Sequence, residues 1–487
     1  MSPYVIAILA ALAILVVILL ARTFSASAKP EPFPPAEPVS VDAEKLAGQL
    51  SRAVQIQTVS TEQNEPPPVK ALHQFQDWMK KTYPRLHKTL KRQVISEYSL
   101  LYTWQGSDPG LKPVLFAAHQ DVVPVDPASE SAWTQPPFGG VIADGYVWGR
   151  GAMDMKHQLV ALLHTVEALI ESGYQPQRTI LLAFGHDEEI GGLKGAKQIA
   201  AHLKAQGIEL EALLDEGLAI VEGYLPGISQ PIALVGASEK GYLSTELSVE
   251  AAPGHASMPP RNTAIGVLAA GLTKLERNPY PAHLAGMAQL FASLGDTAPF
   301  LYRLLFSNLW LFGGLVERFV TRSPQSSAAV RTTQAITIIS GGIKDNILPR
   351  QAKAVINHRL IPGDSIDFVM DRMRRTMDDE RIKVTPLEGN AWEAIPAAEL
   401  ESDQYQMLKT AMRQTFGSLP MAPFIMLGAT DSRHYAIVCR RIFRFSPMLM
   451  SMADKDRVHG IDERISIQTL TKMVEFFTRL MRAWGQG

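Results

Sequence analysis

The sequence contains little cysteine and no surplus of charge of either sign. Its single cysteine, Cys439, excludes an internal disulfide framework and a thiolate metal cluster, so a bound metal has to be held by His, Asp and Glu side chains. The 47 basic residues nearly cancel the 48 acidic ones, and no basic block occurs in the chain. We therefore expect no nucleic-acid partner. At 487 residues the chain is longer than a domain with a single hydrophobic core usually is, which favours two globular units.

The N-terminus lacks charged residues over a long stretch. The run from Tyr4 to Leu20 is uncharged and is about the minimum length for a helix that crosses a membrane. It is also slightly longer than a signal-peptide core, and residues 26–28 have the small-x-small form that signal peptidase cuts. No Lys or Arg precedes the run, which favours a retained single-pass anchor over a cleaved signal or a buried core helix. Anchor and signal alike place the body of the protein outside the cytoplasm or in a lumen.

Short apolar runs alternate with amphipathic helices from about residue 41. The runs at 113–118, 179–184 and 211–214 are typical of buried parallel strands, and apolar residues at helical spacing lie between them. This alternation predicts an α/β layer with a parallel sheet. Near residue 237 the pattern changes to that of a separate α+β sandwich, and from about residue 390 the chain returns to the first domain.

We therefore divide the chain into five segments. They are an anchor or signal segment (1–28), a proline-rich linker that favours an extended spacer (29–40), the first part of the main domain (41–236), an inserted domain (237–389) and the second part of the main domain (390–487). Inside the inserted domain, residues 285–320 form a helical, aromatic-rich insert. This insert either packs on its own domain or on a twin subunit, or it forms a substrate channel or a membrane-facing surface.

Polar side chains follow each of the three predicted strands. His119 comes directly after the first strand, and Asp215 comes directly after the third. Glu188 and Glu189 follow the second strand after a few residues, and Asp154 lies in a glycine-bearing loop that leads into a helix. Open α/β sheets build their ligand sites beyond the carboxyl ends of their strands. We therefore expect these side chains to share one site.

This set of side chains has the composition of a metal site. Imidazole and carboxylate bind hard or borderline divalent ions, and two ions a few ångströms apart need a carboxylate that bridges them. His119 is the one imidazole of the set, and His459 is the candidate for a second. Adjacent acidic residues usually lie on the solvent-exposed face of a helix. An acidic triplet at a strand end between buried segments instead favours a catalytic or metal-binding role. One of two adjacent glutamates can then bind metal while the other moves a proton.

Eight ordered motifs resemble those of the co-catalytic zinc metallopeptidases that include aminoacylase and carboxypeptidase S. The motifs are FAAHQDVVP, GRGAMDMK, GHDEEIGG, LLDEG, GHASMPP, NILPRQAKAVINHR, ATDSR and HGIDERI, and the resemblance covers residues 41–487. SEKGYLSTELSV and the insert with NLWLF are most similar to the branch that holds carboxypeptidase S and the N-fatty-acyl-amino-acid synthase/hydrolase. The resemblance implies an α/β domain of the zinc-peptidase type, interrupted by an α+β (ferredoxin-like) lid or dimerisation domain.

The resemblance also implies a bridged pair of zinc ions in each subunit. It assigns His119 and Asp215 to one Zn²⁺ and Glu189 and His459 to the other, with Asp154 as the bridge. These five residues leave Glu188 outside the ligand set.

Further roles follow from the same resemblance. Glu188 is the general base, Asp121 orients the imidazole of His119, and His255 donates to the oxyanion. In several relatives this histidine comes from a second subunit, which leaves a homodimer open. The residues implied in substrate binding are Asn346 and Arg359 for the α-carboxylate, and Thr430 and Arg433 for the wall of the site.

These features predict a membrane-tethered hydrolase that cleaves an amide bond beside a free carboxylate. N-acyl amino acids, long-chain ones among them, suit the apolar insert and the anchor, whereas carboxypeptidase or dipeptidase action on small peptides is the alternative. Condensation of a fatty acid with an amino acid is the same reaction reversed. A non-catalytic extracytoplasmic binding module is the alternative of another class, and the complete set of ligands and base argues against it.

Overall fold

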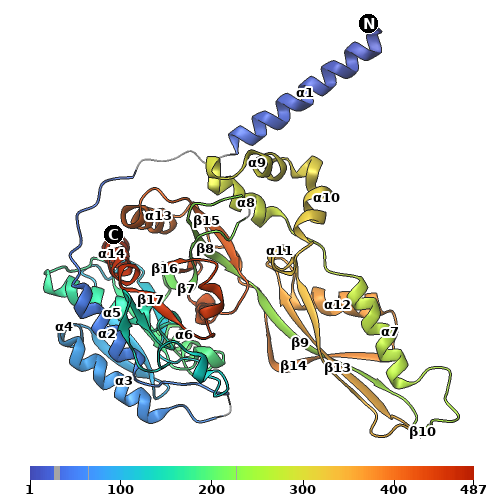
Figure 1. The fold of residues 1–487 in the computed structure, drawn as a ribbon, viewed down its shortest axis with the longest axis horizontal. Coiled ribbons are helices and arrows are strands. Elements are labelled where there is room, and N and C mark those ends of the chain that lie inside the picture. The colour runs from blue at the N-terminus through green and yellow to red at the C-terminus, as the bar shows by residue number, and fades with distance from the viewer. Residues whose placement is uncertain (27–32, 64, 226, 487) are drawn as a thin grey trace.

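The computed structural model describes residues 1–26, 33–63, 65–225 and 227–486. The chain forms two lobes, and one long helix projects from the helices between them (Figure 1). This helix, α1 (Pro3–Ser25), is long and apolar enough to cross a membrane. The predicted cleavage motif at 26–28 and the first linker residues, 29–32, fall almost entirely outside the described residues.

The main lobe is built on an eight-stranded sheet of order β1-β2-β6-β3-β7-β16-β8-β15. Its strands are β1 (Lys91–Ile95), β2 (Ser99–Trp104), β3 (Val114–His119), β6 (Ile180–Gly185), β7 (Ala212–Val221), β8 (Ile232–Glu239), β15 (Met421–Met426) and β16 (Ile442–Met450). The central strands β6, β3, β7 and β16 run parallel. The predicted strands at 113–118 and 179–184 are confirmed to within one residue, whereas the run at 211–214 is only the start of β7.

Helices cover both faces of this sheet. One face carries α2 (Ala43–Val54), α3 (Val69–Thr82), α4 (Pro84–Thr89), α5 (Lys156–Glu171), α13 (Asp403–Phe416) and α14 (Ile467–Trp484), and the other carries α6 (Ala196–Ala205). Along β3 and β6, Phe116 and Leu182 point to the first face, while Leu115 and Leu181 point to the second. Strands buried on both faces need continuous apolar sequence, which explains the runs VLFAA and ILLAF.

The inserted lobe is a four-stranded antiparallel sheet of order β11-β13-β9-β14 with two helices packed on it. Its elements are β9 (Gly241–Glu250), α7 (Ala264–Arg277), β11 (Thr333–Gly341), β13 (Gln351–Leu360), α12 (Ile366–Met377) and β14 (Ile382–Trp392). Their β-α-β-β-α-β order is that of a ferredoxin-like fold. The predicted fold class, an α/β domain interrupted by an α+β domain, is confirmed. Because β14 continues to Trp392, we propose that the inserted domain ends there and not at residue 389.

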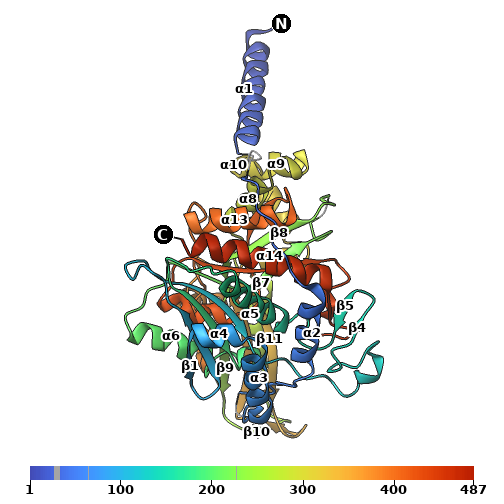
Figure 2. The same ribbon diagram turned by 90° about the vertical axis from the view of Figure 1, so that its left-hand side faces the viewer.

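The aromatic-rich segment 285–320 forms the helices α8 (Ala285–Leu294), α9 (Phe300–Ser307) and α10 (Leu309–Val320), and α11 (Pro324–Val330) follows. Buried side chains of these helices share a cluster with Leu234 of β8 and Ala422 of β15, so the insert packs on the edge of the main sheet. Figure 2 shows α9 and α10 at the base of α1. The remaining short strands of the described chain are β10 (Gly254–His255), β12 (Ile347–Leu348), β4 (Ile142–Ala143), β5 (Tyr146–Trp148) and β17 (Arg464–Ser466).

Candidate metal centre

The strands of the main sheet separate where the predicted site residues gather. β3 and β6 pair in parallel as far as His119 and Gly185, but β3 pairs with β7 only as far as Phe116 and Leu214. Beyond that point β7 no longer pairs with β3. Side chains at this carboxyl edge can therefore face one another, as they do at the ligand sites of other α/β sheets.

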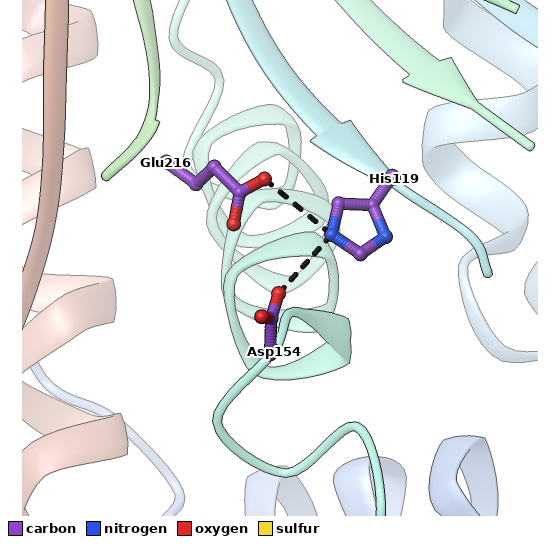
Figure 3. A group of neighbouring side chains, drawn as sticks. All are labelled: His119, Asp154 and Glu216. Carbon is purple, nitrogen blue, oxygen red and sulfur yellow. Dashed lines mark hydrogen bonds and ion pairs between the residues drawn. The ribbon is translucent and has the colours of Figure 1, made fainter. Parts of the chain in front are cut away.

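Three side chains form a first group at this edge. The Nε2 atom of His119 lies 3.2 Å from Oδ1 of Asp154 and 3.5 Å from Oε1 of Glu216. Both carboxylates point at the ring (Figure 3). The imidazole is almost fully buried at the end of β3, while the two carboxylates are partly open. One imidazole and two carboxylates that converge in this way match the ligand preference of a divalent ion.

Asp154 also belongs to a second group. Its Oδ2 atom lies 3.0 Å from Nε2 of His459, and the same nitrogen lies 3.3 Å from Oε2 of Glu189. Asp154 thus presents one oxygen to each group, which is the arrangement of a carboxylate that bridges two ions. Of the five predicted ligands, the structure brings together His119, Asp154, Glu189 and His459.

The structure differs from the sequence prediction at Asp215. The strand continues past this residue, and it is Glu216 that faces His119. The pairing of β7 with Arg444 of β16 breaks directly after Asp215, and Gly217 permits this break because a Cβ there would lie 2.6 Å from the Cβ of Arg444. Burial raises the pKa of Asp215 to about 6. Both carboxylate oxygens of Asp215 are buried and have no hydrogen-bond partner among the described residues, so its role as a ligand stays a prediction. Because Glu216 faces His119, we propose Glu216 as the ligand in place of Asp215.

The two groups hold more acidic than basic side chains. Burial and the charge of Asp154 raise the pKa of Glu216 to about 8, and hydrogen bonds to Asp154 and Glu189 raise the pKa of His459 to about 10. Within the described residues, Oε1 of Glu189 is buried and has no hydrogen-bond partner. Cations held here would satisfy that oxygen and offset the repulsion among the carboxylates. The residues present therefore fit bound metal ions.

Asp121 contacts both His119 and the loop GHDEEIGG, residues 185–192, which we call the glutamate loop. Its Oδ1 atom lies 3.4 Å from Nδ1 of His119, and its backbone carbonyl lies 2.9 Å from the same nitrogen. A proton on Nδ1 that is donated here leaves Nε2 available as a ligand atom. The carboxylate of Asp121 also accepts hydrogen bonds of 3.2 Å from the backbone N–H groups of Glu188 and Glu189. One buried carboxylate thus sets the orientation of three predicted site residues.

The loop GHDEEIGG makes a tight turn directly after β6. Oδ2 of Asp187 accepts a 2.7 Å hydrogen bond from the backbone of Lys194, and its carbonyl accepts one of 2.7 Å from Gly192. Gly192 has a φ of 67°, and a Cβ there would lie 2.0 Å from Oδ1 of Asp431, so this position requires glycine. Asp187 therefore supports the loop and belongs to neither group of candidate ligands.

Glu188 is not a member of either group of candidate ligands. It begins the short 3-10 turn that also contains Glu189. Burial, followed by the negative charge of Glu216, raises the pKa of Glu188 well above its usual range. Glu188 is therefore adjacent to a candidate ligand without belonging to either group.

Glu463 is a residue of this centre that the sequence prediction missed. It is fully buried, and its Oε1 atom accepts hydrogen bonds of 2.7 to 3.0 Å from three backbone N–H groups of the loop that ends at Asp154. Its Oε2 atom lies 2.7 Å from Arg150, whose guanidinium also donates to the carbonyl of His459 at 3.1 Å. This ion pair therefore ties the loop of Asp154 to the loop of His459. The acid in HGIDERI was the only sequence signal for it.

Two arginines and two aromatic rings form a stack beside the centre. The guanidinium of Arg359 lies 4.6 Å from the ring centroid of Tyr242, which in turn stacks on Trp392 at 4.7 Å. The guanidinium of Arg433 lies 4.8 Å from the ring centroid of Trp392 and donates a 2.6 Å hydrogen bond to the carbonyl of Gly191. Contacts of this kind stabilise cations over aromatic faces. The stack connects Arg359 of the inserted lobe to the glutamate loop of the main lobe.

Thr430 belongs to a buried polar network, which corrects its predicted place in the wall of the substrate site. Its hydroxyl donates a 2.9 Å hydrogen bond to Oε2 of Glu239, and that carboxylate is paired at 2.7 Å with Arg444. All three side chains are buried. A buried carboxylate needs donors around it, and Thr430 is one of them.

His255 and Asn346 lie at the tip of the inserted lobe. β10, which contains His255, pairs with β12, and the carbonyl of Asn346 accepts a 3.1 Å hydrogen bond from Ala256. Both residues are exposed, and β10 lies at the end of the lobe that is remote from the main sheet (Figure 1). Within one chain they are therefore apart from the metal centre, in contrast to Arg359.

Paired histidines and carboxylates at the carboxyl edge of an α/β sheet, with a ferredoxin-like lobe inserted between β8 and β15 of that sheet, indicate a metal-dependent peptidase or amidohydrolase. The sequence profile of the peptidase family M20/M25/M40 matches residues 115–483, and the chain belongs to this family. Metallopeptidases of the family use metal ions, and this chain has the side chains to bind them.

Two curated relatives match most of the chain. The probable carboxypeptidase S-like 2 of Dictyostelium discoideum is 42% identical over 446 residues, which cover 90% of this chain and 85% of the relative. The N-fatty-acyl-amino acid synthase/hydrolase PM20D1 of Xenopus tropicalis is 38% identical over 491 residues, covering 99% and 95%. Among solved structures, the M20 family metallo-carboxypeptidase Sso-CP2 from Sulfolobus solfataricus shares the fold, with a TM-score of 0.62, 16% identity and coverage of 92% and 100%.

The proposed ligand set, with Glu216 in place of Asp215, predicts different effects for these two adjacent acids. Glu216→Gln should weaken metal binding about tenfold or more, because it removes a charged oxygen that faces His119. Asp215→Asn should leave the metal content near that of the parent chain. Metal content is measured by mass spectrometry after dialysis against limiting metal, with circular dichroism as the control for folding. Loss of metal only in Asp215→Asn would restore Asp215 as the ligand.

Proposed function

We propose that the chain is a two-zinc hydrolase of amide bonds that lie beside a free carboxylate, with N-acyl amino acids, N-fatty-acyl ones included, as its favoured substrates. The observation that carries this proposal is the position of Asp154 between two groups, each with one histidine and one glutamate. The similarity to N-fatty-acyl-amino acid synthase/hydrolases supports the choice of substrate. Action on small peptides is the second candidate, supported by relatives named carboxypeptidase S.

The proposed ligands divide evenly between the two ions. His119 and Glu216 would hold one ion, Glu189 and His459 would hold the other, and Asp154 would be shared between them. Nitrogen and oxygen ligands of this kind suit Zn²⁺. Zinc supplies polarisation of the amide carbonyl and a more acidic water molecule when it is bound.

Glu188 carries the proton in this proposal. It takes one proton from the attacking water and returns it to the nitrogen of the amide, so that the C–N bond breaks and a free amine and a free acid result. Its place in the same short turn as Glu189, outside both groups of candidate ligands, supports this role because the group has to reach the bound water without holding an ion. The reverse sequence joins an acid and an amine, so the same residues serve hydrolysis and condensation.

Arg359 binds the free carboxylate in this proposal. Its guanidinium is held on Tyr242, and the stack through Trp392 and Arg433 sets its position relative to the glutamate loop. An arginine fixed in this way can form two parallel hydrogen bonds with a carboxylate. Asn346 is too close to the tip of the lobe to act on the same carboxylate within one chain.

His255 and Asn346 act across a homodimer in this proposal, each completing the centre of the partner subunit. Their exposure at the tip supports this arrangement, because a donor to the oxyanion has to reach the reacting carbonyl. The neighbouring edge strand β11 exposes Ile338 and Ile339, and the loop after it exposes Ile343. An unpaired strand edge with exposed isoleucines is suited to an isologous contact with a second copy.

The helix α1 is retained as a membrane anchor in this proposal, with the catalytic body on the extracytoplasmic side. The last turn of α1 packs against the insert. Thr23 is fully buried, and the side chain of Asn308 donates hydrogen bonds of 3.2 Å to the hydroxyl of Thr23 and to the carbonyl of Leu19. Cleavage at residues 26–28 would remove these contacts, so they support retention over secretion.

A substrate panel tests the proposed reaction. The purified chain is offered long-chain N-acyl amino acids, short-chain N-acyl amino acids and dipeptides, each beside its C-terminal carboxamide as a matched control. We expect the long-chain acids to be cleaved fastest and every carboxamide to be cleaved at least about tenfold more slowly, because the charged hydrogen bonds to Arg359 are lost. Faster cleavage of dipeptides would favour the peptidase alternative. Failure to cleave any compound in the presence of zinc would favour the binding module.

Replacement of the proton carrier separates chemistry from metal binding. Glu188→Gln should lower kcat by about a thousandfold or more, because the amide side chain cannot take the proton from water. Its metal content should stay close to that of the parent chain, since Glu188 lies outside both groups of candidate ligands. Glu189→Gln is the matched control and should lose metal and activity together. The opposite result would mean that the two glutamates have exchanged roles.

Mixed dimers test whether His255 acts on the partner subunit. Glu188→Gln and His255→Ala should each be nearly inactive alone. In a dimer of the two variants, one of the two sites contains both changes and the other contains neither. After equal mixing and subunit exchange, activity should return to roughly a quarter of the parent value. Co-purification of two differently tagged variants confirms that exchange has occurred. Exchange without recovery of activity would show that His255 does not act across the dimer.

A further inference from the structure

The helices at the base of α1 expose an unusual amount of apolar surface. Six side chains of α9 and α10 are between 44 and 61% exposed, and we refer to them as the insert face: Phe300, Leu301, Trp310, Leu311, Leu315 and Phe319. Soluble surfaces seldom gather so many large apolar side chains in one place without a binding partner. The opposite side of α10, at Val316 and Val320, is buried in the cluster that joins the insert to the main sheet. The insert face is therefore presented outward on a firmly packed element.

The helix α1 determines where the insert face lies relative to a membrane. A helix of 23 residues is about 35 Å long, slightly more than the roughly 30 Å of a hydrocarbon core. Its C-terminal turn then lies at the membrane interface. That turn contacts the insert directly: Phe24 packs on Phe300 with ring centroids 6.2 Å apart, and Arg22 donates a hydrogen bond to the carbonyl of Ser307. The insert face consequently lies at the depth of the interface.

The body of the molecule leaves this face free to meet lipid. In both views the two lobes extend away from the free end of α1, and α9 and α10 lie at its base (Figures 1 and 2). The tip of the inserted lobe, through which we propose that the dimer forms, lies at β10, away from α9. A second copy held through the tip therefore leaves the insert face uncovered.

The composition of the insert face matches the interfacial region of a bilayer. Leu311, Leu315 and Phe319 recur every four residues and so form one stripe along α10. Trp310 lies near the start of this helix, and the exposed Arg318 lies near its end. Aromatic rings at the headgroup level and arginines that reach toward lipid phosphates are features of helices that lie in a membrane interface.

We propose that the insert face of α9 and α10 lies in the outer leaflet of the membrane that α1 crosses, so that the enzyme is held to the bilayer at two adjoining points. This inference rests on the retention of α1 in the proposed function. It commits to a phospholipid surface as the partner. The dual contact fixes the tilt of the catalytic body relative to the bilayer.

The experiment uses full-length chains reconstituted into phosphatidylcholine vesicles. The one native cysteine, Cys439, is buried, so a new surface cysteine can be labelled selectively with an environment-sensitive fluorophore. Leu315→Cys reports on the insert face. Val94→Cys is the matched control, because Val94 has similar exposure on β1, at the opposite edge of the main sheet. Leu12→Cys, in the middle of α1, reports on insertion of the anchor. Quenching by spin-labelled lipids is then compared among the three, with circular dichroism and turnover as checks on folding.

We expect the Leu315 label to be quenched several-fold more strongly than the Val94 label, and most strongly by lipids labelled near the headgroup. Quenching at Leu12 without quenching at Leu315 would overturn the inference while leaving the anchor in place. A Leu315 label that is shielded from water but not quenched by lipid would also overturn it, because protein would then cover the face. Absence of quenching at Leu12 would refute the retained anchor, and the inference with it.

Discussion

The shared carboxylate of Asp154 is the constraint on which the rest of the centre depends. It offers one oxygen to His119 and the other to His459, so its position has to be fixed from both sides. Glu463 fixes the loop of Asp154 by accepting hydrogen bonds from its backbone, and Asp121 accepts hydrogen bonds from the backbone of Glu188 and Glu189 in the neighbouring loop. Each of these supports is itself a buried charge that needs donors, so the polar contacts of the centre depend on one another and hold a single geometry.

The same dependence explains how three adjacent acids acquire three different environments. Asp187 turns back to its own loop, Glu189 faces His459, and Glu188 lies between them with a raised pKa. The tight turn that separates them is possible because Gly192 accommodates the close approach of Asp431. The backbone of one short loop therefore converts a run of identical charges into a support, a candidate ligand and a candidate proton carrier.

Much of this arrangement could be predicted from strand ends and motif order. The convergence of His119, Asp154 and Glu189 followed from their places in the sequence, whereas His459 was selected through the resemblance of its motif; their metal stays a proposal. The choice between Asp215 and Glu216 could not be predicted, because it depends on where the pairing of β7 breaks, and that break involves Arg444 far along the chain. The contacts of Thr430 and Glu463 could not be predicted, because burial in a polar network leaves no periodic signal. The fold class was predictable, since both its helical and its strand periods are strong, but the packing of the insert on the main sheet was not.

The two ends of the molecule also limit how a pair of chains can sit together. α1 leaves the body from the insert, whereas the proposed contact between subunits is at the tip of the inserted lobe. If both chains are anchored in one bilayer, the two-fold axis has to run along the membrane normal, because any other direction would send the two anchors to opposite sides. Encounter between subunits is then confined to two dimensions, which raises their effective concentration without any additional contact. The anchor would in this way favour the assembly of active sites as well as their attachment to the membrane.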